Sequence, residues 1–179
     1  MTLSELDPRY PVGKFIKPEI VTPDERSGAM ATLAELPELL RNAVDGLDST
    51  QLNTPYRDGG WTLRQVVHHV ADSHMNAFIR FKLALTESNS QIKPYDEKAW
   101  ATLPDAQGID IEHSLRLLEG LHARWSALLS SLTPEQLDRT FNHPESGPQK
   151  IDRTLQTYAW HSRHHVAHIR ALRERNGWR

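Results

Sequence analysis

The chain has no cysteine among its 179 residues, and this absence excludes several kinds of site. Without thiols the protein forms no disulfide, holds no iron–sulfur cluster, builds no thiolate zinc site and offers no cysteine nucleophile. A metal ion can therefore have no thiolate ligand from this chain. A chain without cysteine also suits a reducing compartment, so we expect a cytoplasmic protein.

Long apolar runs and an excess of one charge are absent as well. No 18 apolar residues follow one another, so the sequence predicts no transmembrane helix and no membrane partner. The first 26 residues carry four prolines and scattered charges in place of the apolar core of a signal peptide. With a net charge of -2 and no block of basic residues, the chain predicts no nucleic-acid partner.

Apolar residues recur at helical spacing in four segments. These segments run from Thr22 to about Leu47, from Thr62 to about Glu87, from about Asp110 to Ser131, and from about Ile151 to Asn176. Pro37 interrupts the first segment, and a kink or a break is expected there. No stretch alternates with a period of two between hairpin turns, so no sheet is needed to explain the pattern.

This pattern predicts an all-α fold, a four-helix bundle. We expect a single domain over residues 1–179, in which residues 1–22 form an extended N-terminal arm. The connections at about 48–61, 88–109 and 132–150 are longer than a simple bundle requires. Long connections often carry function, so we expect them to form the walls of a pocket at one end of the bundle.

The most informative feature that is present is a group of four histidines within eight residues of the last helical segment. They are His161, His164, His165 and His168. Residues four apart lie one above the other on a helix, and His161 and His165 are the pair nearest the inward-facing stripe. These two are the best candidates to bind one metal ion. His164 and His168 lie farther round the helix, as supporting or surface groups.

A second group, about 90 residues upstream, can supply a third ligand. His74 lies in the middle of the apolar stripe of the second helical segment, whereas His69 lies on its flank beside small residues that leave room for an ion. His68 points away from the stripe. Periodicity favours His74, so the residues alone leave the choice between His69 and His74 open. Three imidazoles with an open position are typical of a catalytic metal site.

Ordinary buried or surface histidines are the alternative to metal binding. His113, His122 and His143 have no histidine at a ligand spacing, and for them we expect ordinary roles. The pair on the last helix is not part of a His-Glu-x-x-His motif, so the usual carboxylate base of zinc proteases is missing. Any general base must come from elsewhere in the chain.

Long motifs in this chain resemble the YfiT-like metal-dependent hydrolases of the DinB superfamily. The motifs run over Gly60–Asn76, Ile79–Glu87, Lys93–Trp100 and Trp160–Ile169, and the resemblance extends from Tyr10 to Trp178. It implies a four-helix bundle, a homodimer and one divalent metal ion per subunit, zinc or nickel. It also implies the ligand set His69, His161 and His165, and thus prefers His69 to His74.

The resemblance implies a hydrolase that acts on a small molecule with a metal-activated water. Asp72 is a candidate to support the ligands, and the candidates for substrate binding are Arg80, Lys82, Tyr95 and Trp100. Two alternatives remain. One is a metal-dependent thiol S-transferase that uses bacillithiol or a related low-molecular-weight thiol on electrophilic small molecules. The other is a bundle that binds metal without catalysis.

Overall fold

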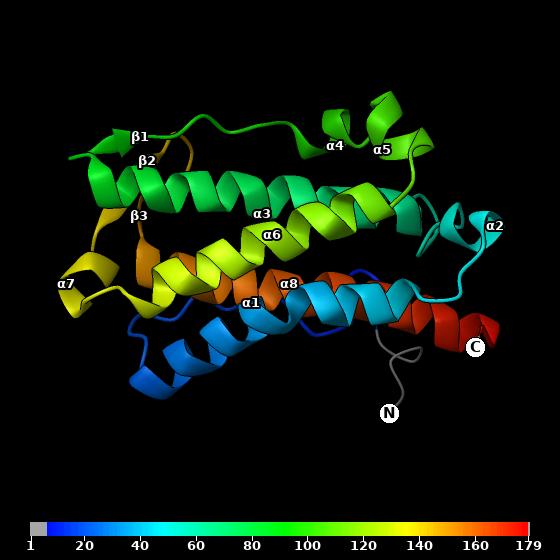
Figure 1. The fold of residues 1–179 in the computed structure, drawn as a ribbon, viewed down its shortest axis with the longest axis horizontal. Coiled ribbons are helices and arrows are strands. Elements are labelled where there is room, and N and C mark those ends of the chain that lie inside the picture. Colours follow the sequence, from blue (N-terminus) through cyan, green and yellow to red (C-terminus); the bar gives the residue numbers. More distant parts are fainter. Residues whose placement is uncertain (1–6, 179) are drawn as a thin grey trace.

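Four long helices form the body of the molecule (Figure 1). They are α1 (Pro23–Val44), α3 (Leu63–Thr86), α6 (Glu112–Ser130) and α8 (Ile151–Asn176). The structure, a computed structural model, describes residues 7–178. The helix boundaries agree closely with those expected from the sequence, and the all-α four-helix bundle is confirmed.

The starts and ends of the helices follow from local sequence. The side chains of Thr22 and Thr62 each accept a hydrogen bond from the backbone N–H three residues on. The side chains of Glu25 and Gln65 in turn accept a hydrogen bond from the backbone N–H of the capping threonine. These capping boxes satisfy N–H groups that have no partner inside the helix. Gly177 ends α8 in the left-handed region, at a φ of 65°, which glycine adopts without strain.

The direction of the helices makes one connection cross the whole bundle. The helices α1 and α8 run one way, and α3 and α6 run the other way (Figure 1). Each of α1 and α3 packs against both α6 and α8. Because α3 and α6 run in the same direction, the chain between them must return along the bundle. This connection contains β1 (Ser90–Gln91), α4 (Glu97–Trp100) and α5 (Pro104–Gly108), and α5 packs on α3.

A small sheet lies where the sequence predicted only loops. The strands β2 (Thr140–His143) and β3 (Gly147–Lys150) form an antiparallel hairpin, and β1 pairs parallel with β2. The expectation that no sheet is needed is therefore wrong for this end of the bundle. Strands of two to four residues are too short to show sustained alternation in the sequence. Two further single-turn helices, α2 (Ser49–Leu52) and α7 (Pro134–Leu137), also lie in the expected loops.

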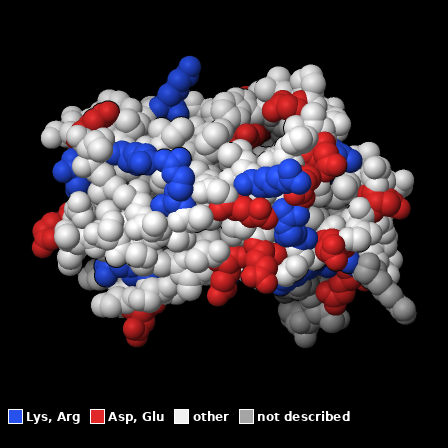
Figure 2. Space-filling model, viewed as in Figure 1, with Lys and Arg blue, Asp and Glu red and all other residues white. Residues whose placement is uncertain are grey.

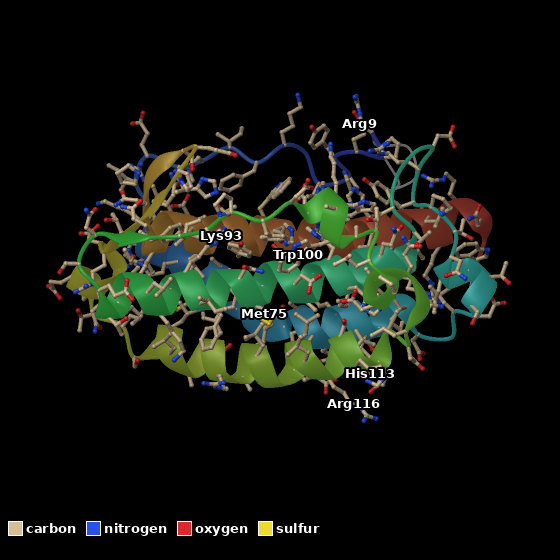
Figure 3. The ribbon with its side chains drawn as sticks, turned by 90° about the horizontal axis from the view of Figure 1, so that it is seen from above. Arg9, Met75, Lys93, Trp100, His113 and Arg116 are labelled. Atoms are coloured by element: carbon tan, nitrogen blue, oxygen red, sulfur yellow. The ribbon has the colours of Figure 1, made fainter. Side chains whose placement is uncertain are left out.

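The N-terminal segment lies along α8. In Figure 3 it passes on the side of the bundle that carries Arg9, opposite α6 with His113 and Arg116. The indole nitrogen of Trp160 donates a hydrogen bond to the carbonyl of Gly13 at 3.1 Å. The expected arm thus agrees with the structure over residues 7–22, and residues 1–6 of that prediction lie outside the described residues.

The apolar core consists of two clusters that follow one another along the bundle. On each long helix, residues of one cluster precede residues of the other. Members of the first cluster include Leu33, Ala77, Trp125 and Tyr158, and members of the second include Leu36, Ala71, Leu118 and Val166. The histidines His74, His122 and His161 lie in sequence between these members. The polar imidazoles therefore occupy the level at which the two apolar clusters meet.

Helix α1 continues without a break through Pro37. Proline has no backbone N–H, so the carbonyl of Leu33, four residues earlier, loses its partner within the helix. The buried His122 on α6 replaces that partner, because its Nδ1 donates a hydrogen bond to the Leu33 oxygen at 2.6 Å. Of the kink or break expected at Pro37, the break does not occur. His122 is buried in the core between α1 and α6.

The surface carries both signs of charge close together. Figure 2 shows Lys and Arg interspersed with Asp and Glu on the face formed by α1 and α6. There Arg41 pairs with Glu112 and Glu119, at 2.8 and 2.7 Å. Such exposed pairs contribute little to stability. Over residues 7–178, none of the helices combines the length and the apolar character that a membrane span requires.

Burial of His122 predicts that acid destabilises the protein. Burial lowers the pKa of His122 from 6.5 to about 4, so the folded chain binds its proton less readily than the unfolded chain. The free energy of unfolding that depends on a neutral His122 is fully present above pH 6.5 and is lost as the pH falls toward 4. Between pH 7 and 4.5 the wild type should therefore lose about 2 kcal/mol more unfolding free energy than His122→Gln, as measured in urea titrations. Equal losses in both proteins would contradict a neutral, buried His122.

Candidate metal centre

Three histidines from two helices meet in one place. His69 on α3 and His161 and His165 on α8 each present a ring nitrogen, and these nitrogens all lie within 4.8 Å of one another. The Nε2 atoms of His69 and His161 are 3.2 Å apart. Two nitrogens bound to a tetrahedral zinc ion at its usual distances lie about 3.3 Å apart, so this pair fits a shared metal ion.

The three imidazoles are neutral at pH 7. Burial lowers the pKa of His69 to about 4, and burial and the neighbouring imidazoles hold the pKa values of His161 and His165 well below 6.5. A neutral imidazole has one nitrogen with a free lone pair, which is the form that binds a metal ion. His161 is half-buried and keeps part of its surface open, whereas His69 and His165 are buried.

A second group of histidines lies directly beside the first. His164, His165 and His168 also present ring nitrogens within 4.8 Å of one another, so His165 belongs to both groups. His164 stacks on Trp160 with ring centres 4.4 Å apart, and His168 stacks on Tyr56 at 4.1 Å. Both side chains are buried, which excludes the surface position that the sequence left open and leaves the position next to His165.

The remaining histidines lie behind or away from this centre. His74 is fully buried, as its place in the apolar stripe predicted, but it contacts His161 from behind: its Nε2 lies 3.1 Å from the Nδ1 of His161. His68 is also buried, with its Nδ1 2.8 Å from the hydroxyl of Ser114 on α6. The inward-facing His74 on α3 thus lies in the core, whereas His69, on the flank of the same helix, lies against the other candidate ligands.

The histidines form one wall of a cavity of about 640 Å³. Its other walls come from the loop before α3 and from the long connection between α3 and α6. The residues that these two segments contribute are Tyr56, Arg57, Gly59, Gly60, Trp61, Glu97, Lys98 and Thr102. Two of the three long connections form walls of a pocket, as the sequence predicted. The predicted position at one end of the bundle is wrong, because the cavity lies beside Trp160 and His168, in the middle part of α8.

The candidates for substrate binding do not line this cavity. Among the described residues, Arg80, Lys82, Tyr95 and Trp100 are not part of its walls. Tyr95 packs on Trp100 with ring centres 4.4 Å apart, and burial raises the pKa of Tyr95 to about 12. Lys82 lies over the ring of Phe78. Figure 3 shows Lys93 and Trp100 on the connection that passes over α3 and α8. The proposed role of these four residues in substrate binding stays a prediction.

Asp72 has no direct link to the candidate ligands. No hydrogen bond within residues 7–178 joins its carboxylate to His69, His161 or His165. Burial raises the pKa of Asp72 to about 6. Its supporting role therefore stays a prediction, and the group that contacts a candidate ligand from behind is His74.

Sequence reasoning missed three charged residues of the cavity wall. Glu97 and Lys98 lie in the same motif as Tyr95 and Trp100, but only the fold of α4 shows which members of the motif face the histidines. A helix of four residues has no periodicity from which a face can be predicted. Arg57 was missed for the same reason, because it lies in an irregular loop.

Comparison with known proteins agrees with this geometry. The family model described as the DinB superfamily matches residues 32–169. Relatives from Bacillus mycoides and Bacillus cereus, each named "Putative metal-dependent hydrolase", are 53% identical over 172 residues, which is 96% of this chain and 99% of theirs.

Two solved structures are similar to this one. YfiT from Bacillus subtilis, described as "a probable metal-dependent hydrolase with an unusual four-helix bundle topology", has a TM-score of 0.94 and 48% identity. The match covers 97% of this chain and 100% of YfiT. The four-helix bundle protein TT2238 matches with a TM-score of 0.55 and 22% identity over 79% of this chain and 94% of its own, which supports the fold alone. The family match and the near-complete overlap with YfiT show that this chain is a YfiT-like member of the DinB superfamily.

Proposed function

We propose that this protein is a metal-dependent hydrolase that binds one divalent ion through His69, His161 and His165. The observation that carries the proposal is the position of three neutral imidazoles in the wall of a large cavity. The names of its relatives support the same reaction class. Zinc and nickel both suit a set of three nitrogen ligands. We also propose a homodimer, as in the resembled family, and its molecular mass in light scattering tests this.

The chemistry of such a site divides between the ion and the chain. A divalent ion held by three imidazoles supplies Lewis acidity to a substrate carbonyl and lowers the pKa of water toward neutrality. The chain fixes the ligand positions, because two of them lie one turn apart on α8 and the third lies on a helix that packs against α8. The ring of Trp61, 4.6 Å from that of His69, limits the movement of the third ligand.

The charged residues of the cavity wall indicate how a substrate is bound. Arg57 and Lys98 carry positive charge into the wall, and we propose that they bind an anionic or polarised group of the substrate. Glu97 is the carboxylate in the same wall, and it sits in the first turn of α4. We propose that Glu97 takes up the proton that water loses during hydrolysis, since the usual carboxylate of zinc proteases is missing.

Removal of a ligand should remove the metal. We expect one ion per chain in the wild type and little bound metal in His69→Ala, His161→Ala and His165→Ala, as measured by elemental analysis after dialysis. The matched control is His68→Ala, which removes a buried histidine from the same helix and should retain the ion. A full complement of bound metal in His69→Ala would show that His69 is not the third ligand and would favour His74. Loss of the ion in His164→Ala would instead assign it to the second histidine group.

Loss of the proposed base should lower turnover without lowering metal content. We expect Glu97→Gln to reduce kcat by about 100-fold, because general base catalysis typically contributes that much or more. Bound metal should stay at the wild-type level, since Glu97 is not one of the ligands. Glu87→Gln, at the exposed end of α3, is the control. Unchanged kcat in Glu97→Gln would show that another group takes up the proton.

Dependence on added thiol separates hydrolysis from the alternative of thiol transfer. The lack of cysteine is compatible with a thiol that arrives as a cosubstrate and loses its proton on binding a metal ion. We expect the metal-loaded protein to hydrolyse activated esters or amides at the same rate with and without bacillithiol, cysteine or glutathione. Strict dependence on one of these thiols would replace the hydrolase by a thiol S-transferase. Absence of any turnover would favour a bundle that only binds metal.

A further inference from the structure

A row of three histidines connects the candidate metal centre to the backbone of α1. The Nδ1 of His161 lies 3.1 Å from the Nε2 of His74, and the Nδ1 of His74 lies 3.1 Å from the Nε2 of His122. The Nδ1 of His122 lies 2.6 Å from the carbonyl oxygen of Leu33. His74 and His122 are almost entirely buried. Each contact joins one nitrogen of one ring to one nitrogen or oxygen of the next group.

The carbonyl of Leu33 decides which nitrogen of each ring carries the proton. A carbonyl oxygen only accepts hydrogen bonds, so the Nδ1 of His122 must donate and carry a proton. The Nε2 of a neutral His122 then has only a lone pair and accepts from the Nδ1 of His74. By the same rule, the Nε2 of His74 accepts from the Nδ1 of His161. The Nε2 of His161 is left with a lone pair and no proton.

The opposite direction of donation along these three hydrogen bonds is unfavourable. The reversed direction would place two acceptors against each other at 2.6 Å, at the contact between His122 and Leu33. Adding a second proton to His122 would avoid that clash but would bury a positive charge. No carboxylate within residues 7–178 forms a hydrogen bond with His122, so that charge would have no compensating partner.

The unprotonated nitrogen points to the candidate metal centre. The Nε2 of His161 is the atom that lies 3.2 Å from the Nε2 of His69. We propose that the Leu33 carbonyl, through His122 and His74, holds His161 in the tautomer whose Nε2 is ready to bind metal. His74 and His122 are thus positioning residues. The proposal rests on the proposed role of His161 as a ligand, but the tautomers themselves exist without metal.

Partners of this kind have measurable consequences. A hydrogen bond to the second nitrogen of a ligand histidine fixes the orientation of the ring and raises its basicity, and removal of such partners costs about 10- to 100-fold in metal affinity. The fold reserves the Leu33 carbonyl for His122 because Pro37 cannot supply an N–H to it. The Leu33 carbonyl, which has no partner within α1, therefore orients His161 on α8 through the rings of His122 and His74.

The first test is the tautomer of each histidine in the full-length, metal-free protein. Two-bond nitrogen–proton NMR spectra of the ¹⁵N-labelled chain distinguish a protonated Nδ1 from a protonated Nε2. We expect His161, His74 and His122 to carry the proton on Nδ1. A protonated Nε2 on any of the three would overturn the proposal. This result does not depend on whether the protein is a hydrolase or on which ion it binds.

The second test is zinc affinity in matched variants. His122→Leu should raise the Kd for zinc by about tenfold and mix the tautomers of His74 and His161. His122→Gln should keep a Kd near that of the wild type, since an amide can accept from His74 and donate to Leu33. The control is His68→Leu. It removes a buried histidine that is not one of the three hydrogen-bonded histidines, and it should change neither the Kd for zinc nor the tautomers of His74 and His161.

The outcomes separate the two proposals. Unchanged Kd and unchanged tautomers in His122→Leu would overturn the orienting role of the row. If His122→Leu does not fold, the test uses His122→Gln. A wild-type Kd together with wild-type tautomers in this variant supports the orienting role. Mixed tautomers with an unchanged Kd contradict it. Protonated Nδ1 atoms in all three rings together with metal retention in His161→Ala would keep the tautomer assignment and reject the ligand assignment.

Discussion

Buried imidazole is the constraint on which this structure depends. A neutral imidazole in an apolar interior needs a partner for each nitrogen, because an unsatisfied buried polar group costs free energy. For both nitrogens of His74 and of His122 the bundle provides partners in a row, at the level where its two apolar clusters meet. That row begins at the Leu33 carbonyl and ends at His161, at the edge of the cavity. Core packing and the candidate metal centre are therefore parts of one hydrogen-bonded arrangement.

The helix directions account for the cavity. Since α3 and α6 run in the same direction, a long connection must pass back over the bundle, and part of it covers the histidines (Figure 1). A simple antiparallel bundle would have joined these helices by a short turn and left the histidines without that wall. Glu97 and Lys98 reach the cavity on this connection. The same topology that makes the loop long thus brings acidic and basic groups to the candidate metal centre.

Much of the fold could be predicted, because it follows from local pattern. Apolar spacing predicted all four long helices, and the spacing of His161 and His165 predicted that both rings lie at one site. The helical wheel alone chose His74 over His69, and it was correct that His74 faces inward. An inward position, however, leads into the core. The flank of α3 faces the other ring nitrogens, and only the resemblance to a known family indicated His69.

What the sequence determined by itself is the chemistry that is available: nitrogen ligands because cysteine is absent, paired histidines on one helix, and a carbonyl that Pro37 leaves without a helical partner. Tertiary structure alone decided which groups meet. It brought His122 to Leu33, His74 to the back of His161, and Glu97 to the cavity wall. The reason is physical, because helix formation depends on neighbours a few residues apart, whereas these contacts depend on how whole helices pack and in which direction they run.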